Sequence, residues 1–371
     1  MVTGHAGLAS VIREKDDLAR QATDILCRMI NIPSVSMEEN LVADLIGDEL
    51  EKYGFIPQRK LNNVWARIDA GYRLPTILLN SHLDTVKPVK GWDTDPFHAE
   101  IHDNRIYGLG SNDAGASLVS LLATFVHLSG IPELPFNLVF AATAEEEITG
   151  QNGISSIITE LGNVDLGIIG EPTGMRMAVA EKGLMVIDCT AFGHSSHVSH
   201  QPADNAIYNA IKDIDRIRNY QFQKTSPGLG DVQMQVTEIS AGYQHNVIPD
   251  RCTFTLDVRS NDLYTNKEIY EILKDHLEST IIPRSLRLNS SSIPDSHPVV
   301  RKAVSMGIEC FGSSTLSDQS VLPFATVKIG PGDSGRSHTA NEFIEVEEIA
   351  GGIETYVRLL TGLKISRNNQ S

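Results

Sequence analysis

The segment TILLNSHLDTV, residues 76–86, is a short apolar run that passes directly into polar residues. Such a run predicts a buried β-strand, and residues at a strand's carboxyl end are where α/β proteins usually carry their chemistry. Two later segments repeat the order: NLVFAATAEEE (137–147) runs into three acids, and VDLGIIGEPT (164–173) runs into an acid and a turn. The sequence therefore predicts three strands that deliver polar clusters to one sheet edge.

Helical patterns lie between and before these strands, at residues 15–30, 38–53 and 116–128. Each repeats its apolar residues at helical spacing or forms a continuous apolar helix. Strands that alternate with helices predict an α/β fold, with a mixed, mainly parallel sheet and helices on both of its faces.

From about residue 178 the strands alternate polar and apolar residues, which is typical of a sheet with one wet face. Strands at 186–193, 233–241, 252–259 and 284–289, with helices at 204–218 and 266–279, predict a βαββαβ order. We expect residues 178–290 to form an inserted α+β domain between two parts of a first domain, 1–177 and 291–371.

Composition narrows the classes of function. A chain of 371 residues with 41% apolar content predicts two domains with filled cores. The formal charge of −16 argues against a nucleic-acid partner, which would require clustered Lys and Arg. The four cysteines lie far apart without a CxxC spacing, and neither an export signal nor an apolar run of about 18 residues is visible. We expect a cytoplasmic protein with reduced thiols and no membrane contact.

The polar residues after the strands have the chemistry of metal ligands. In SHLDT, His82 and Asp84 point to the same face, and a carboxylate commonly orients a metal-binding histidine. Asp113 lies in GLGSNDAGAS (108–117), where a helix cap is the alternative. Three adjacent carboxylates, Glu145 to Glu147, repel each other unless cations neutralise them, although a solvated acidic loop is the alternative here.

Two more segments complete the pattern. Glu171 follows a strand in GEPTG (170–174), and His338 closes the glycine-rich GPGDSGRSHTANE (330–342). Two histidines with several carboxylates are the donors of a zinc pair bound by nitrogen and oxygen, whereas magnesium would not require the histidines. The GxSxG segment of a serine hydrolase is absent.

In these segments the chain resembles the zinc-dependent hydrolase family that includes acetylornithine deacetylase, succinyl-diaminopimelate desuccinylase, aminoacylase and glutamate carboxypeptidase. SHLDTV is similar to the family's H-x-D motif, GSND to G-x-x-D and AEEE to D-E-E, and GEPT is unchanged. The motifs occur in family order along nearly the whole chain. Within the family the pattern most resembles acetylornithine deacetylase.

The resemblance implies a role for each residue. Asp113 would bridge two zinc ions, for which cobalt or manganese could substitute. Asp84 would orient His82, and Glu146 would be the general base that serves a metal-activated water. The alignment leaves Glu145 in the position where relatives carry Asp. The remaining ligands would be His82 and Glu171 on one ion, and Glu147 and His338 on the other.

The inserted region resembles the family's lid and dimerisation domain. GHSSH (193–197) matches G-x-x-x-H, which implies that His197 stabilises an oxyanion in the active site of a partner subunit, and hence a homodimer. A solvated histidine loop is the alternative. Asn246 and Arg259 match substrate-binding positions, and a guanidinium suits a substrate carboxylate, although an internal ion pair would also explain Arg259.

The resemblance implies a small N-acyl amino acid as substrate, first of all N-acetylornithine, or N-acetylcitrulline or an N-succinyl analogue, in arginine biosynthesis. In this family a Glu at position 171 accompanies deacylases and carboxypeptidases. A desuccinylase acting on diaminopimelate, or a dipeptidase, is the alternative with the same chemistry. A catalytically silent binding or assembly protein is the alternative of another class. Ser334 and Arg336 differ from relatives, and no role for them follows from the sequence.

Overall fold

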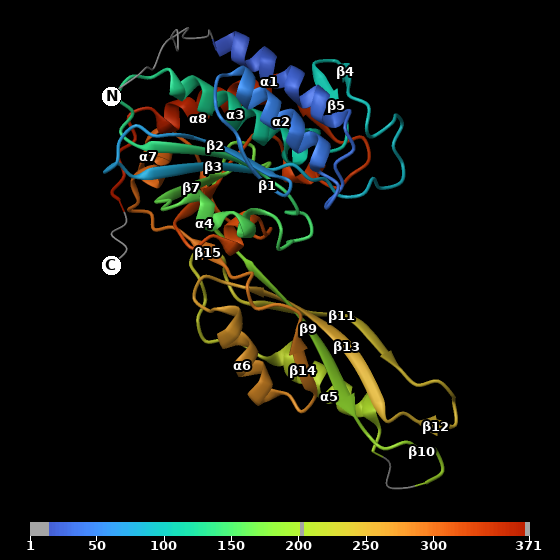
Figure 1. The fold of residues 1–371 in the computed structure, drawn as a ribbon. Coiled ribbons are helices and arrows are strands. Elements are labelled where there is room, and N and C mark those ends of the chain that lie inside the picture. The colour runs from blue at the N-terminus through green and yellow to red at the C-terminus, as the bar shows by residue number, and fades with distance from the viewer. Residues whose placement is uncertain (1–14, 201–203, 368–371) are drawn as a thin grey trace. The chain divides into compact units, whose positions relative to one another are not determined.

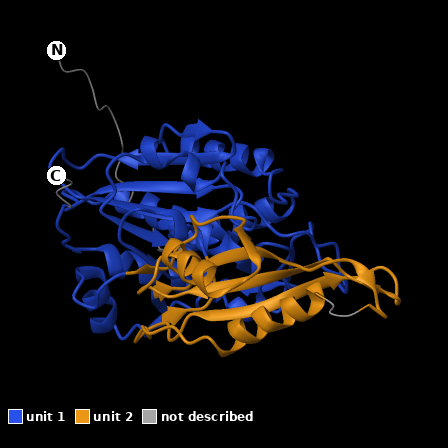
Figure 2. Cartoon of the chain, turned by 90° about the horizontal axis from the view of Figure 1, so that it is seen from below, with its two compact units in different colours: residues 1–179, 293–311, 317–371 blue, residues 180–292, 312–316 orange. Residues whose placement is uncertain are grey.

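The computed structural model describes residues 15–200 and 204–367. The chain folds into two compact units, coloured in Figure 2. Unit 1 contains residues 1–179, 293–311 and 317–371, and unit 2 contains residues 180–292 and 312–316. The sequence analysis predicts an insertion at residues 178–290, within two residues of the segment 180–292. It gives no sign that the short segment 312–316 belongs to the same unit as the insertion.

Unit 1 is built on a sheet whose four central strands are parallel. The order is β1-β2-β6-β3-β7-β17-β8, in which β6, β3, β7 and β17 run in the same direction and the flanking strands are antiparallel. The central strands are buried along their whole length, which explains their continuous apolar sequences. The bounds are β1 Gln58–Lys60, β2 Asn63–Ile68, β3 Thr76–His82, β6 Asn137–Thr143, β7 Leu166–Ile169, β8 Met177–Glu181 and β17 Thr326–Lys328.

Helices cover both faces of this sheet (Figure 1). One face packs Ile77, Leu79 and Phe140 against the long helices in the larger core, and the other packs Leu78 and Val139 against short helical turns. The long helices are α1 Lys15–Ile30, α2 Asn40–Lys52, α3 Ala116–Ser129, α7 Pro298–Ser305 and α8 Val346–Leu360. The short turns are η2 Ile154–Ser156, α4 Ile158–Leu161 and η3 Asp318–Val321. The predicted fold class of unit 1 is confirmed.

Smaller elements complete unit 1. A three-stranded sheet has the order β18-β5-β4, and it joins the chain just before residue 110 to the C-terminal part. The bounds are β4 Glu100–His102, β5 Arg105–Tyr107, β16 Cys310–Ser313, η4 Ser334–Arg336 and β18 Phe343–Glu345.

Unit 2 is an antiparallel sheet, β11-β13-β9-β14, with two helices packed on one face. Buried residues alternate along β9 and β13, as the sequence predicts for a half-wet sheet. The bounds are β9 Gly183–Phe192, β10 Ser196–His197, α5 Ala206–Asn219, β11 Gln233–Ala241, β12 Val247–Ile248, β13 Arg251–Ser260, α6 Asn266–His276, β14 Thr280–Pro283 and β15 Ser291–Ser292.

The last strand of unit 2 is not where the sequence analysis expects it. We predict a helix through residue 279 and a strand at 284–289, whereas α6 ends at His276 and β14 spans Thr280–Pro283. The β-branched residues before Pro283 favour a strand. Pro283 lacks a backbone N–H and is tolerated at the end of β14, which is an edge strand and pairs with β9.

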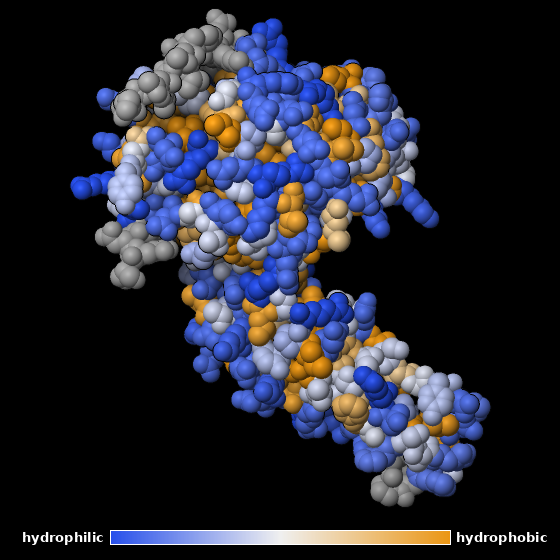
Figure 3. Space-filling model, in the orientation of Figure 1, coloured by the Kyte–Doolittle hydropathy of each residue, from blue (hydrophilic) through white to orange (hydrophobic). Residues whose placement is uncertain are grey.

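The exposed residues in the view of Figure 3 are mainly hydrophilic, with apolar residues interspersed. None of the helices in the described ranges combines the length and apolar character that crossing a bilayer requires. All four cysteines are free thiols, and burial raises the pKa of each.

Candidate metal centre

The parallel strands bring polar side chains together because their carboxyl ends meet at one edge of the sheet. His82 ends β3, Glu147 follows β6, Glu171 follows β7, and His338 lies in the loop after β17. Asp113 comes from the segment that precedes α3. These residues form two groups in which the donor atoms all lie within 4.8 Å of one another: His82, Asp113 and Glu171, and Asp113, Glu147 and His338.

Asp113 belongs to both groups, and its two oxygens face different histidines. Oδ1 lies 3.3 Å from Nε2 of His82, and Oδ2 lies 3.7 Å from Nε2 of His338. Gly115, not Asp113, is the N-cap residue of α3, so helix capping does not explain Asp113. The geometry is that of a carboxylate able to bridge two cations.

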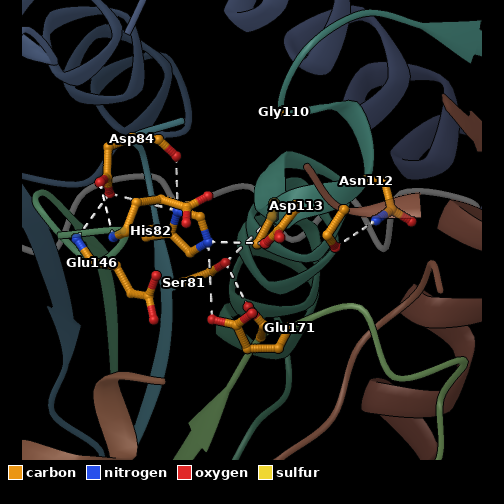
Figure 4. A network of polar contacts seen from close by, with 12 residues as sticks. Ser81, His82, Asp84, Gly110, Asn112, Asp113, Glu146 and Glu171 are labelled. Carbon is orange, nitrogen blue, oxygen red and sulfur yellow. Dashed lines mark hydrogen bonds and ion pairs between the residues drawn. The ribbon is translucent and has the colours of Figure 1, made fainter. Parts of the chain in front are cut away.

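The ring of His82 is oriented for a cation. Its Nδ1 lies 2.8 Å from the backbone oxygen of Asp84. Because a carbonyl oxygen can only accept a hydrogen bond, Nδ1 donates its proton to Asp84, and Nε2 is the ring atom that faces Asp113 and Glu171, with Oε1 of Glu171 at 3.9 Å (Figure 4). Burial acts to lower the pKa of His82, but its hydrogen bonds with Asp113 and Asp84 and the charges of nearby acids outweigh burial, and the pKa is raised well above its ordinary range. Nε2 therefore donates a proton to Asp113 or, where a cation lies between them, presents a lone pair to that cation.

His338 completes the second group. Its Nε2 lies 3.0 Å from Oε2 of Glu147, and its side chain is half-exposed. The backbone of His338 has a φ of 59°, in the left-handed region. The hydrogen bond with Glu147 raises the pKa of His338 to about 9.

The acids of the site are crowded and buried. Burial raises the pKa of Glu171 to about 8, and burial together with Glu171 raises that of Glu146 well above its ordinary range. Burial also raises the pKa of Glu147. For Asp113, burial is the largest single cause and acts upward, but the hydrogen bond and charge of His82, together with Ser337 and His338, outweigh it and lower the pKa. Such clustering of negative charge favours bound cations, and the donor set fits two of them.

Asp84 has a wider role than the sequence indicates. Its carboxylate accepts hydrogen bonds from the backbone N–H of Glu146 at 3.0 Å and of Glu147 at 3.1 Å, and from the hydroxyl of Ser36 at 2.7 Å. Its nearer oxygen is 3.5 Å from Nδ1 of His82, further than the backbone oxygen. Asp84 therefore holds the Glu146–Glu147 backbone as well as the His82 ring. Ser36 is a contributor that the sequence analysis misses.

The three adjacent acids have separate surroundings. The carboxylate of Glu145 belongs to neither donor group and accepts hydrogen bonds from the backbone N–H and the side-chain amide of Asn152. Glu146 lies within electrostatic range of Glu171 and His82. Glu145 therefore has a structural partner, Asn152, whereas Glu146 and Glu147 lie close to the candidate metal ligands.

Two further buried acids lie near the site, and the sequence analysis assigns them no role. Asp318 accepts hydrogen bonds from Asn80 at 2.8 Å and Thr143 at 3.0 Å, and burial raises its pKa to about 6. Glu342 accepts backbone hydrogen bonds from the segment that carries Asp113. Glu342 is the last residue of the segment GPGDSGRSHTANE (330–342), which also contains His338. The sequence alone does not show that this loop acid is buried.

Arg336 has local partners in unit 1. Its guanidinium lies 2.6 Å from Glu348 and 4.5 Å from the ring centre of Phe343. Ser334 begins the short turn η4, which Asp333 caps through the N–H of Gly335. The contacts of Arg336 give it a structural role beside α8.

The predicted residues of unit 2 fall into two places. His197 lies on β10, opposite Val247 on β12, and its exposed ring forms a hydrogen bond of 2.8 Å with the Ser199 hydroxyl. Asn246 lies beside it, because its backbone oxygen accepts the N–H of Val198. Arg259 lies near the other end of β13. It is about 26 Å along the strand from Arg251, which pairs with Phe192, the residue just before the GHSSH segment. Asp257 holds the Arg259 guanidinium through two bonds, at 2.8 and 3.2 Å.

A parallel-sheet fold with two histidines and clustered acids at its carboxyl edge has the donor set that a metal-dependent hydrolase requires. Residues 78–362 match the model of peptidase family M20/M25/M40, and the chain belongs to this family.

Curated relatives are named succinyl-diaminopimelate desuccinylase. One from Wolbachia pipientis wMel is 24% identical over 353 residues, covering 87% of this chain and 88% of the relative. Another from Rhodospirillum centenum is 26% identical over 290 residues, covering 71% and 74%. The prediction that acetylornithine deacetylase is the nearest branch stays a prediction.

Solved structures share the fold. An M20 family metallo-carboxypeptidase from Sulfolobus solfataricus aligns with a TM-score of 0.73 at 19% identity, over 92% of this chain and 98% of the other. A dinuclear metal-binding M20 peptidase from Bacillus subtilis aligns with a TM-score of 0.72 at 16% identity, over 94% and 99%.

Proposed function

We propose that this chain is a two-metal amide hydrolase that removes the acyl group from an N-acyl amino acid. One observation carries the proposal: the two oxygens of Asp113 face two separate groups of donors. His82, Asp113 and Glu171 would hold one cation, and Asp113, Glu147 and His338 the other. The mixed nitrogen and oxygen donors favour zinc, with cobalt or manganese as substitutes.

When bound, the two cations would supply positive charge that polarises the amide carbonyl and makes a nearby water more acidic. The protein's part is to hold the donors and to move the proton. Glu146 is the proposed base: its backbone is fixed by Asp84, and its carboxylate lies among Glu171, His82 and Glu147. It would accept the proton from water and return it to the leaving amine.

We further propose that His197 stabilises the developing oxyanion and that Asn246 contacts the substrate. Their adjacency at the β10–β12 end of unit 2 supports a joint role. Arg259 is proposed to bind the substrate carboxylate, for which it would have to exchange its bonds to Asp257.

The proposed oligomer is a homodimer in which His197 serves the site of the partner subunit. Mixing tests it. A His197→Ala chain and a Glu146→Gln chain, each inactive alone, should regain activity when refolded together, because one site of the hybrid then has both residues. Hybrids that stay inactive, or a monomer in sedimentation at working concentration, would contradict the dimer.

For the substrate we propose N-acetylornithine first, with N-acetylcitrulline and N-succinyl analogues as close variants, in the cytoplasmic synthesis of arginine. The family resemblance of the motifs supports this choice. Succinyl-diaminopimelate is the second candidate, because the curated relatives carry the desuccinylase name.

Release of free amine separates these candidates. The panel contains N-acetylornithine, N-acetylcitrulline, N-succinyl-ornithine, N-succinyl-citrulline, succinyl-diaminopimelate and simple dipeptides, each with and without chelator. Chelator-sensitive cleavage of one acyl amino acid supports the deacylase and names its substrate. Cleavage of dipeptides alone would move the chain to a peptidase role. No cleavage by protein with two bound zinc ions would overturn the proposal in favour of a silent binder.

A further inference from the structure

Glu342 is a buried carboxylate whose hydrogen bonds hold the segment 110–113. Its Oε1 accepts the backbone N–H of Asn112 and of Asp113, both at 2.9 Å, and its Oε2 accepts that of Gly110 at 3.3 Å. Only 2% of its surface is exposed. Three N–H donors offset part of the cost of burying the charge, and all three come from the segment that carries Asp113.

Asn112 makes the same connection in the opposite direction. Its side-chain Nδ2 donates to the backbone oxygen of Asp333 at 3.1 Å and to the hydroxyl of Ser337 at 3.3 Å, and its Oδ1 accepts the N–H of Asp333 at 2.9 Å. The approach is close: a Cβ at Gly332 would lie 2.4 Å from Oδ1 of Asn112. Residues 110–113 and 332–342 are thus tied by bonds from both sides. We call this set of bonds the loop clamp.

The loop clamp joins the two segments that supply Asp113 and His338. The side chains of these residues approach to 3.7 Å. His82 and Glu171, by contrast, follow directly from β3 and β7, which pair in parallel within the buried sheet. The geometry of the second donor group therefore depends on how the two loops that carry Asp113 and His338 are positioned against each other. In the first group, by contrast, two of the three donors are held by strand pairing.

We propose that the loop clamp sets the second cation position, Asp113 with Glu147 and His338, and that Glu342 and Asn112 are positioning residues for it. The inference rests on the metal pair of the proposed function. Donor atoms must meet a cation within a few tenths of an ångström, so a shift between the two loops separates Asp113 from His338. The first position keeps His82 and Glu171 on their strands.

The test counts metal and requires no substrate. Metal-free protein is dialysed against Co²⁺ and, separately, Zn²⁺, and bound metal is measured by atomic absorption across the titration. Wild-type protein is expected to bind two ions per chain. Glu342→Gln keeps the shape but presents an amide N–H₂ to the backbone donors. It is expected to weaken the second ion about 10- to 100-fold and to leave the first unchanged.

Asp213→Asn is the matched control. Asp213 is a buried carboxylate in unit 2 that accepts the backbone N–H of Glu278 at 3.2 Å and of Ser279 at 2.6 Å. Its substitution should lower the melting temperature while both ions bind as in wild type. If Glu342→Gln does not fold, Asn112→Ala carries the test, since it removes the side-chain bonds of the clamp and keeps those of Glu342.

The outcomes separate the two proposals. Wild-type protein that binds fewer than two ions contradicts the proposed metal pair itself. Wild-type protein with two ions, together with Glu342→Gln or Asn112→Ala variants that bind both ions with wild-type affinity, overturns the loop clamp as a positioning device. Equal weakening of both ions overturns the assignment to the second position.

Discussion

The carboxyl edge of the unit 1 sheet and the β10–β12 end of unit 2 both carry residues with expected chemistry, but they are built differently. At the first, buried parallel strands and buried hydrogen-bond acceptors hold most of the candidate donors, as Asp84 holds the backbone of Glu146 and Glu147, while His338 in its loop is half-exposed. At the second, His197 lies on an exposed two-residue strand and bonds Ser199. Unit 1 thus presents a preorganised group of side chains, whereas the roles proposed for the unit 2 residues require a bound substrate or partner.

Removal of Asp113 should have the largest effect, because both donor groups share it. We expect Asp113→Ala to bind less than one ion per chain and to lose more than about 10³-fold in kcat/KM. Asp165→Asn is the control, since this buried acid accepts the N–H of Thr76 at the other end of β3. Metal analysis and amine release check both. Two ions retained by Asp113→Ala would refute the shared role.

Substitution of the proposed base tests whether Glu145 and Glu146 have different roles, one in stability and the other in proton transfer. Glu146→Gln should keep both ions and lower kcat about 10²- to 10⁴-fold, because proton transfer is lost while the ligands stay. Glu145→Gln is the matched control and should cost about 1 kcal/mol of stability through its bonds to Asn152, with near-normal kcat. Loss of an ion from Glu146→Gln would give that residue the ligand role.

His197→Ala tests unit 2 alone. Because the ring is exposed, the melting temperature and metal content should stay at wild-type values, while kcat falls about 10²- to 10³-fold through loss of an oxyanion donor. His194→Ala is the control; that ring bonds Asp204 at 2.8 Å. Wild-type turnover by the His197 variant would end the oxyanion proposal and leave the solvated loop.

Ser36→Ala should have the smallest effect and sharpens the account of preorganisation. It removes one of the bonds to the Asp84 carboxylate and is expected to cost about 1 kcal/mol, seen as a several-fold lower kcat with both ions bound. Ser129→Ala removes a bond of equal length to Val126 at the end of α3 and should leave kcat unchanged. Equal kcat in the two variants would show that the Ser36 bond does not support the site.

Much of the fold follows from the sequence because the apolar runs are long and their ends are marked. The strands at Thr76, Asn137 and Leu166 are predicted from continuous apolar residues, and the half-wet sheet from alternation. The position of β14 is missed because the charged end of α6 continues the helical pattern and Pro283 suggests a break before a strand. Pairing with β9 places the strand at the β-branched residues before Pro283, which the sequence analysis assigns to no strand.

The candidate donors were visible in sequence because His82, Glu147 and Glu171 follow strands whose ends the topology gathers, and because Asp113 and His338 lie in glycine-rich loops that resemble family motifs. The surrounding shell was not. Ser36 donates to the Asp84 carboxylate, Asp318 accepts from the Asn80 amide and Glu342 accepts from backbone N–H groups. All of these partners are far away in sequence, and no spacing rule marks such contacts. The roles of His197, Asn246 and Arg259 stay predictions, since each depends on a bound substrate or partner.

The place of β17 in the sheet has a consequence for the order of events during synthesis. In the sheet order this strand lies between β7 and β8, although it is made after the whole of unit 2. His82, Asp113 and Glu171 leave the ribosome first, and His338 follows roughly 10 to 30 s later at ordinary elongation rates. During that interval the nascent chain already contains the three residues of the first proposed cation position, while the edge of β7 opposite β3 is still unpaired. Arrival of β17 both closes the sheet and delivers the last donor.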